Sequence, residues 1–71
     1  MAKENYKKLA NDALKDEKYV PAEIYFKAAR IRKEGCKKIA NKLLKKGNYI
    51  IAAEYFEKAE MEKEAKECYE K

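Results

Sequence analysis

The sequence contains no histidine, serine, threonine, glutamine or tryptophan, and only two cysteines and two glycines. A hydrolytic triad needs an imidazole or equivalent base beside its nucleophile, and no histidine is present to activate Cys36 or Cys68. Gly35 and Gly47 stand too far apart for a loop that cradles phosphate. The composition allows a mechanism with two carboxylates, but these alternate with lysines and arginines as on solvated helix faces. We therefore predict no catalytic residues and no enzyme activity.

Metal sites and membrane spans are also missing from the sequence pattern. Cys36 and Cys68 lie far apart in the sequence with no histidine nearby, which fits no zinc spacing, so we predict no metal and no cofactor. Because a dense cysteine framework and a signal peptide are absent, two reduced, buried thiols are favoured over a disulfide. The longest apolar run, YIIAA at 49–53, is far too short to span a bilayer. The expected compartment is the cytoplasm, with no membrane partner.

What is present favours one small helical domain. The 71 residues are 46% hydrophobic and 44% charged, and they are rich in alanine, glutamate, lysine and leucine, which are strong helix formers. We treat 1–71 as a single domain, which buries only about 60% of its unfolded surface. The scarcity of amides beside abundant lysine, glutamate and tyrosine fits a thermophilic protein, and it fits a designed sequence equally well.

The chain contains an internal repeat. KKLAN at 7–11 returns as KKIAN at 37–41, and the same shift also aligns the other positions listed here: Tyr19 with Tyr49, Ala22 with Ala52, Tyr25-Phe26 with Tyr55-Phe56, Ala29 with Ala59, Lys33 with Lys63 and Glu34 with Glu64. Such a period indicates stacked supersecondary units. We predict unit one at about 3–34 and unit two at about 35–64, with 65–71 as an extension or cap.

Each unit has the pattern of two helices, so the predicted fold is all-α, with two stacked antiparallel helical hairpins. Apolar residues at helical spacing predict four helices at roughly 3–16, 20–34, 36–46 and 49–60. Pro21 suits the first turn of the second helix, Gly35 is expected to end it, and Gly47-Asn48 marks the next turn.

The C-terminal segment 61–71 leaves two alternatives. No glycine or proline interrupts 48–71, so we expect one long final helix. The alternative is a fifth helical segment that covers the open end of the stack, because an uncapped repeat exposes apolar surface.

At these spacings the chain resembles the tetratricopeptide repeat family. The family pattern is matched in unit two by Ala40, Gly47, Tyr49, Ala52, Phe56 and Ala59, and in unit one by Ala10, Tyr19, Ala22, Phe26 and Ala29, with Glu17 where the turn glycine would stand. The resemblance covers both units and therefore most of the chain, but the period here is shorter than the family's by about one helical turn. A second resemblance, to the three-helix microtubule-interacting-and-trafficking domain, fits the internal repeat less well.

The tetratricopeptide resemblance implies a binding face for peptides or proteins on the first helix of each unit. The residues it places there are Lys7, Asn11, Leu14 and Lys15 in unit one, and Lys37, Asn41, Leu44 and Lys45 in unit two. Lys7 and Asn11 match a lysine–asparagine pair with which some members hold a terminal carboxylate, whereas Lys38 stands where the family has its second asparagine. Lysine and asparagine can both donate to a carboxylate. The alternative is that these are ordinary solvated residues, duplicated with the unit.

Charge is distributed unevenly along the chain. Residues 1–46 hold 14 basic and 6 acidic side chains, whereas residues 47–71 hold 4 and 7. The predicted function is therefore a scaffold that binds a protein or peptide, preferably acidic, in a basic groove. A designed or fragmentary scaffold that forms a homo-oligomer through basic front and acidic back is the alternative. Nucleic-acid binding ranks third, because most tyrosines lie on the apolar stripes.

Overall fold

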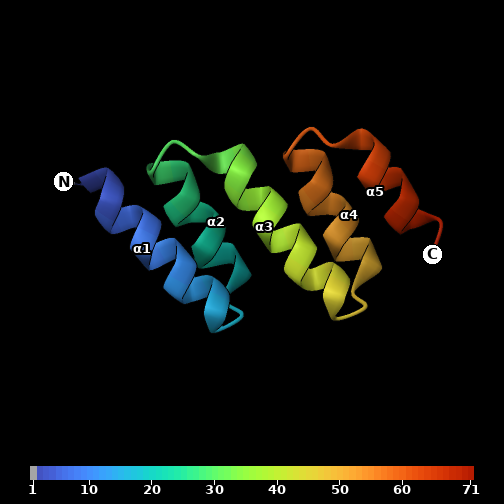
Figure 1. Ribbon diagram of the computed structural model, residues 1–71, viewed down its shortest axis with the longest axis horizontal. Coiled ribbons are helices and arrows are strands. Elements are labelled where there is room, and N and C mark those ends of the chain that lie inside the picture. Colours follow the sequence, from blue (N-terminus) through green and yellow to red (C-terminus); the bar gives the residue numbers. More distant parts are fainter. Residues whose placement is uncertain (1) are drawn as a thin grey trace.

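The computed structural model describes the backbone of residues 2–71 and the side chains from Glu4 onward. This part of the chain folds into five helices: α1 (Ala2–Lys15), α2 (Tyr19–Ala28), α3 (Arg32–Lys45), α4 (Tyr49–Lys58) and α5 (Glu62–Tyr69). They follow one another along an elongated body of 41 × 22 × 13 Å, each antiparallel to the one before (Figure 1). The predicted all-α class is confirmed, and none of the described helices has both the length and the apolar character that crossing a bilayer needs.

The internal repeat of the sequence holds in three dimensions. α1, α3 and α5 begin at positions 2, 32 and 62, and α2 and α4 begin at 19 and 49. The hairpins α1–α2 and α3–α4 are both present, and α2 packs against α3 between them. The prediction of four helices is wrong, because α5 opens a third unit with 8 residues where α1 and α3 have 14.

All four connections between the described helices use the same turn. One residue adopts a left-handed conformation, and the N–H of the following residue donates to a carbonyl five positions back, which is the Schellman pattern of helix termination. The left-handed residues are Glu17, Arg30, Gly47 and Glu60, with φ of 62°, 63°, 82° and 60°. These hydrogen bonds run from Lys18 N to Ala13 O, Ile31 N to Phe26 O, Asn48 N to Leu43 O, and Met61 N to Phe56 O, with donor–acceptor distances of 2.8–3.0 Å.

Gly35 does not end a helix, contrary to the prediction from sequence. It lies buried within α3, while α2 already ends at Ala28 and Arg30 forms the turn. A Cβ atom at position 35 would come within 2.1 Å of Cγ of Phe26. The glycine is therefore explained by the close approach of a ring on α2 to the backbone of α3, and the predicted boundary at 34–36 is wrong.

The long final helix is also a wrong prediction, and the alternative of a fifth segment is confirmed. α4 ends at Lys58, and the left-handed Glu60 turns the chain back so that α5 packs against α4. No glycine or proline is needed, because the carbonyl of Phe56 accepts the N–H of Met61 at 2.8 Å and completes the termination.

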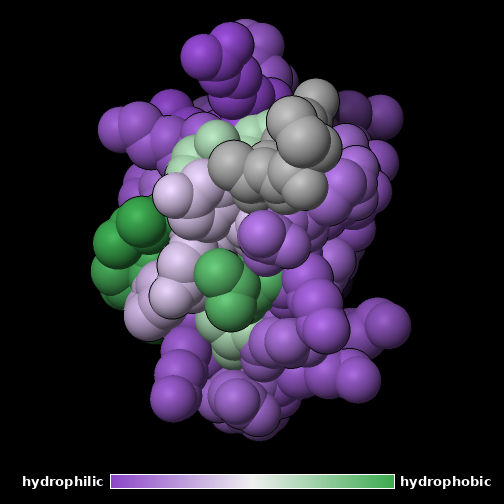
Figure 2. All heavy atoms as spheres, turned by 90° about the vertical axis from the view of Figure 1, so that its left-hand side faces the viewer, coloured by the Kyte–Doolittle hydropathy of each residue, from purple (hydrophilic) through white to green (hydrophobic). Residues whose placement is uncertain are grey.

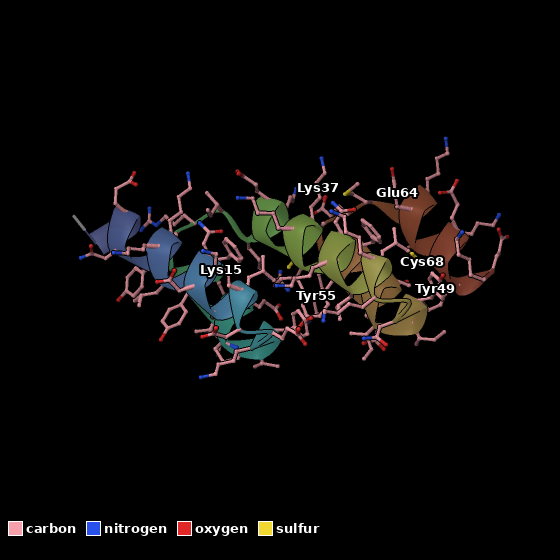
Figure 3. The ribbon with its side chains drawn as sticks, turned by 60° about the horizontal axis from the view of Figure 1, so that its bottom comes forward. Lys15, Lys37, Tyr49, Tyr55, Glu64 and Cys68 are labelled. Carbon is pink, nitrogen blue, oxygen red and sulfur yellow. The ribbon has the colours of Figure 1, made fainter. Side chains whose placement is uncertain are left out.

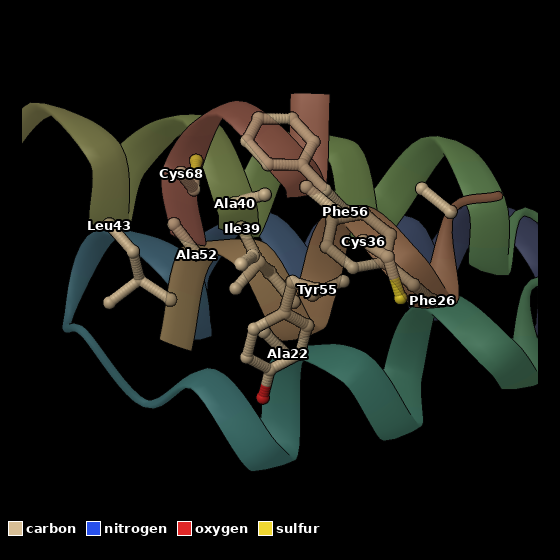
Figure 4. Packing of buried hydrophobic residues seen from close by; sticks show 14 of the residues in the cluster. Ala22, Phe26, Cys36, Ile39, Ala40, Leu43, Ala52, Tyr55, Phe56 and Cys68 are labelled. Carbon is tan, nitrogen blue, oxygen red and sulfur yellow. The ribbon is translucent and has the colours of Figure 1, made fainter. Parts of the chain in front are cut away.

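A single apolar core runs between the helices (Figure 4). Its largest fully buried side chains are Phe26, Cys36, Ile39 and Leu43, all at or beside the contact of α2 with α3. Small residues line the seams, where the alanines at 10, 22, 40 and 52 are fully buried, as expected for closely packed helices. Cys36 and Cys68 are free, and both are buried as predicted.

Candidate partner-binding groove

A hollow of about 320 Å³ lies between α3 and α5. Its lining residues come from α3, from α4 with its following turn, and from α5 with the residues after it: Lys37, Asn41, Leu44, Phe56, Met61, Glu64, Glu67, Cys68 and Lys71. We call this hollow the α3–α5 groove. Three of the residues that sequence analysis assigned to a binding face, Lys37, Asn41 and Leu44, lie in it together.

Helical spacing explains why the α3 residues meet. Positions 37, 41 and 44 are separated by steps of four and then three, so their side chains share one face of α3. The opposite wall is formed by Glu64 and Glu67, which are three positions apart on α5. In Figure 3, Lys37 and Glu64 lie on the same side of the molecule, one from each helix.

Burial of one side of α5 holds this second wall in place. Ala65 and Cys68 are buried and belong to the core cluster. Their neighbours Glu64 and Glu67 are therefore turned toward the groove, with Glu64 half-buried and Glu67 exposed. The short third-unit helix thus supplies carboxylates to the side of the groove that faces Lys37.

The floor of the α3–α5 groove is apolar. Leu44 and Met61 are half-buried and pack against the core, and Phe56 is a buried member of that core. Lysines at 37 and 71 and glutamates at 64 and 67 stand around this floor. The arrangement suits a segment that inserts an apolar side chain and carries charge on either side of it.

The other predicted residues are distributed as follows. On α1, Lys7 and Lys15 are exposed, whereas Asn11 and Leu14 are half-buried. On α3, Lys38 is half-buried and Lys45 exposed. None of these other residues lines the α3–α5 groove. The structure therefore brings together the unit-two residues at 37, 41 and 44, and it leaves the unit-one set on a separate helix.

The acidic wall of the groove was not predicted from the sequence. Glu64 and Glu67 lie in the segment that was expected to continue the fourth helix. A signal for their position was present, because IRKEG at 31–35 returns as MEKEA at 61–65 and marks the start of a third unit. The same comparison would have placed Met61 at the equivalent of Ile31, just before a helix.

Several basic residues are paired within the fold. Glu23, only 16% exposed at its side chain, accepts from Lys58 Nζ at 3.1 Å and lies 3.7 Å from Arg32, so it links α2, α3 and α4. Lys46 Nζ donates to Glu17 at 2.6 Å, and this hydrogen bond holds the pKa of the Glu17 carboxyl below its usual value. Among the described side chains Lys37 has no ion-pair partner, so its charge is available in the groove.

No family model, no curated protein and no solved structure matches this chain.

Proposed function

We propose that the chain is a tetratricopeptide-like protein-binding module and that the α3–α5 groove holds a peptide segment of a protein partner. The observation that supports this is the joint presence of Lys37, Asn41 and Leu44 in one hollow with an apolar floor. Helical repeats expose such hollows because each unit covers only its neighbours.

The lining determines the chemistry of the proposed segment. An acidic side chain or a terminal carboxylate fits beside Lys37 and Asn41, where it receives hydrogen bonds from an ammonium and an amide. An apolar side chain of the same segment fits over Leu44. Glu64 and Glu67 disfavour a second acidic group on the α5 side, so they set the direction in which an acidic segment can lie.

The test is an NMR titration of the ¹⁵N-labelled chain with a synthetic pentapeptide that carries leucine next to glutamates and a free carboxyl terminus. We expect shift changes at Asn41, Leu44 and Glu64, and about tenfold weaker binding after Lys37→Ala, as expected for the loss of a charge-assisted hydrogen bond. Lys45→Ala is the matched control, because Lys45 is exposed on the same helix outside the groove. Equal affinities of the wild type and Lys37→Ala would reject the groove as the binding site.

A self-associating scaffold is a second candidate, because the outer face of α1 is apolar. Tyr6 and Leu9 are 38% and 43% exposed, whereas their counterparts in the next unit, Cys36 and Ile39, are fully buried. The Tyr6 ring stacks on the Tyr25 ring, with 6.4 Å between the ring centroids. Figure 2 shows the apolar surface at this end of the molecule between hydrophilic flanks. Light scattering on a sizing column, with Leu9→Lys for comparison, tests whether this face joins two copies.

A further inference from the structure

The two walls of the α3–α5 groove carry charges of opposite sign. The α3 wall presents Lys37 and the neutral amide of Asn41, whereas the α5 wall presents Glu64 and Glu67. Among the side chains that the structure describes, neither glutamate has an ion-pair partner, and Glu64 is half-buried. Because withdrawing a carboxylate from water without a counter-charge is unfavourable, this wall would stabilise a cation brought by a ligand.

The internal repeat shows that this opposition of charge is particular to the α3–α5 groove. α1, α3 and α5 begin at residues 2, 32 and 62, so position 67 is the counterpart of 37 and of 7. The first two units have lysine at this position, and the third has glutamate. α1 and α3 therefore carry the same charge at equivalent places, while α3 and α5 carry opposite charges.

Lys71 also lines the groove, but it does not neutralise the α5 wall. It follows the end of α5, and its ammonium lies over the Tyr49 ring, 5.8 Å from the ring centroid. It forms no ion pair with Glu64 or Glu67. The lining residues that belong to α5 itself, Glu64, Glu67 and Cys68, thus give this wall a negative charge.

We infer that the segment of a protein partner held in the α3–α5 groove is zwitterionic. It carries an acidic residue that faces the α3 wall, an apolar residue over the floor, and a lysine or arginine that faces Glu64 and Glu67. This inference rests on the proposed function and names the class of peptide that the groove takes. The basic group forms charge-assisted hydrogen bonds with the two carboxylates, whereas a uniformly acidic segment satisfies only the α3 wall.

An extended segment can reach the floor and both walls with consecutive residues. In polyproline II geometry three residues complete one turn, so neighbouring side chains point about 120° apart. One apolar side chain then contacts Leu44 and Met61 on the floor, and the residues before and after it face opposite walls. The expected motif is an apolar residue between an acidic and a basic one, in the order set by the chain direction.

The probe is an acetylated and amidated peptide with glutamate, leucine and lysine in consecutive positions between glycines, titrated into the ¹⁵N-labelled full chain. The reversed order, lysine–leucine–glutamate, is titrated in parallel. We expect the better of the two to bind about threefold to fivefold more tightly than its analogue with glutamine in place of lysine, as for an exposed ion pair. The net charge of +5 on the whole chain disfavours a basic ligand, so a general attraction would not produce this gain.

Protein variants assign the gain to the α5 wall. Glu67→Gln should reduce the advantage of the lysine peptide, and Glu67→Lys, which restores the residue of the first two units, should reverse it. Glu62→Gln is the matched control, because Glu62 is exposed on α5 and lines a different hollow with Lys66 and Tyr69. This control should keep the full advantage of the lysine peptide.

The outcomes separate this inference from the proposed function. If the acidic pentapeptide binds and requires Lys37, but the lysine and glutamine peptides bind equally in both orders, the inference is overturned and the proposed function holds. An equal gain in the wild type and in Glu67→Lys also overturns it, because the basic side chain would then lie elsewhere. If no peptide shifts the signals of Asn41, Leu44 and Glu64, both are rejected.

Discussion

The α2–α3 and α4–α5 junctions begin with the same turn and continue differently. Arg30 and Glu60 have nearly the same φ, 63° and 60°, and Ile31 and Met61 donate to equivalent carbonyls. At the first junction a 14-residue helix follows, and at the second an 8-residue helix. At both junctions the turn sets the direction of the next helix, and the length of that helix determines how much of the preceding hairpin it covers.

The consequence is an uneven distribution of the core. Phe26, Ile39 and Leu43 are fully buried at the first junction, and Glu23 adds ion pairs to α3 and α4. At the second junction Tyr49 and Ile51 remain accessible. A helical repeat gains stability mainly between neighbouring units, so we expect the first junction to carry more of the free energy of unfolding than the second.

The largest effect is expected for Gly35→Ala. Its Cβ would come within 2.1–2.5 Å of three atoms of Phe26, so the ring or the whole helix must move. Overpacking of this kind costs roughly 1–3 kcal/mol, occasionally more, and the better helix propensity of alanine regains up to about 1 kcal/mol. We expect a net loss of about 2 kcal/mol in the free energy of unfolding, measured by urea denaturation and circular dichroism.

The matched change at the second junction is Ala65→Gly, because position 65 is the counterpart of 35. Here a Cβ is already accommodated in the core. We expect the loss of helix propensity, about 1 kcal/mol, together with roughly 0.8 kcal/mol for the methyl group removed from the core, and no steric clash. A Gly35→Ala protein as stable as the wild type would show that the Phe26 ring can move freely and that the two junctions do not differ in closeness of approach.

Much of the fold could be predicted from local pattern. Apolar periodicity predicted the helices of both hairpins, and the alanine positions predicted the seams, because both depend on spacing over a short stretch of chain. Arg30 and Glu60 could not be recognised as turn residues, since non-glycine residues are uncommon in the left-handed conformation. The role of Gly35 depends on Phe26, which faces it from another helix, so a one-dimensional pattern cannot show it.

One wall of the candidate site, the one on α3, could be predicted from the sequence, and the wall on α5 could not. Lys37, Asn41 and Leu44 came from the repeat and its resemblance, and they share a face because helical spacing requires it. Glu64 and Glu67 were missed because their position depends on the turn at Glu60. A wall that comes from a later helix becomes predictable only when the break before that helix is recognised.

The first junction should also respond to alkaline pH. Burial raises the pKa of the Cys36 thiol, with a further contribution from Glu23, and burial likewise raises the pKa of the Tyr55 phenol. Folding therefore favours the protonated forms. Their contribution is fully present below the unfolded pKa of each group, about 8.5 for cysteine and 10 for tyrosine, and is lost as pH rises through the folded pKa. We expect stability to fall above about pH 8.5, by at most about 1.4 kcal/mol per pH unit for each group.

Urea midpoints between pH 7 and 10.5 measure this slope, and Cys36→Ala should make it shallower from about pH 8.5. Tyr55→Phe should act mainly above about pH 10, which separates the two groups. An unchanged slope in Cys36→Ala would mean that the thiol at the first junction ionises as easily in the folded as in the unfolded chain.

A smaller effect is expected from removing the lysine that α3 places at the end of α1. Lys42→Met retains most of the aliphatic length but loses the 2.6 Å hydrogen bond to the Leu14 carbonyl. We expect the free energy of unfolding to fall by about 1 kcal/mol. Lys45→Met is the control, because Lys45 is exposed and should change stability by less than about 0.5 kcal/mol. Equal effects of the two substitutions would remove the electrostatic difference between the junctions.

The smallest effect tests what the junctions share. Arg30→Gly and Glu60→Gly relieve a left-handed conformation that costs an L-residue about 1–2 kcal/mol, and they add roughly 0.4–1 kcal/mol of chain entropy to the unfolded state. We expect each variant to be more stable by about 0.5 kcal/mol. The gain should be slightly smaller for Glu60→Gly, because Glu60 lies 3.1 Å from Lys33 in an exposed ion pair. Thermal unfolding of the two variants beside the wild type measures both stability changes. Similar gains mean that the turns are equivalent and that the helices after them make the difference; opposite signs would place the difference in the turns themselves.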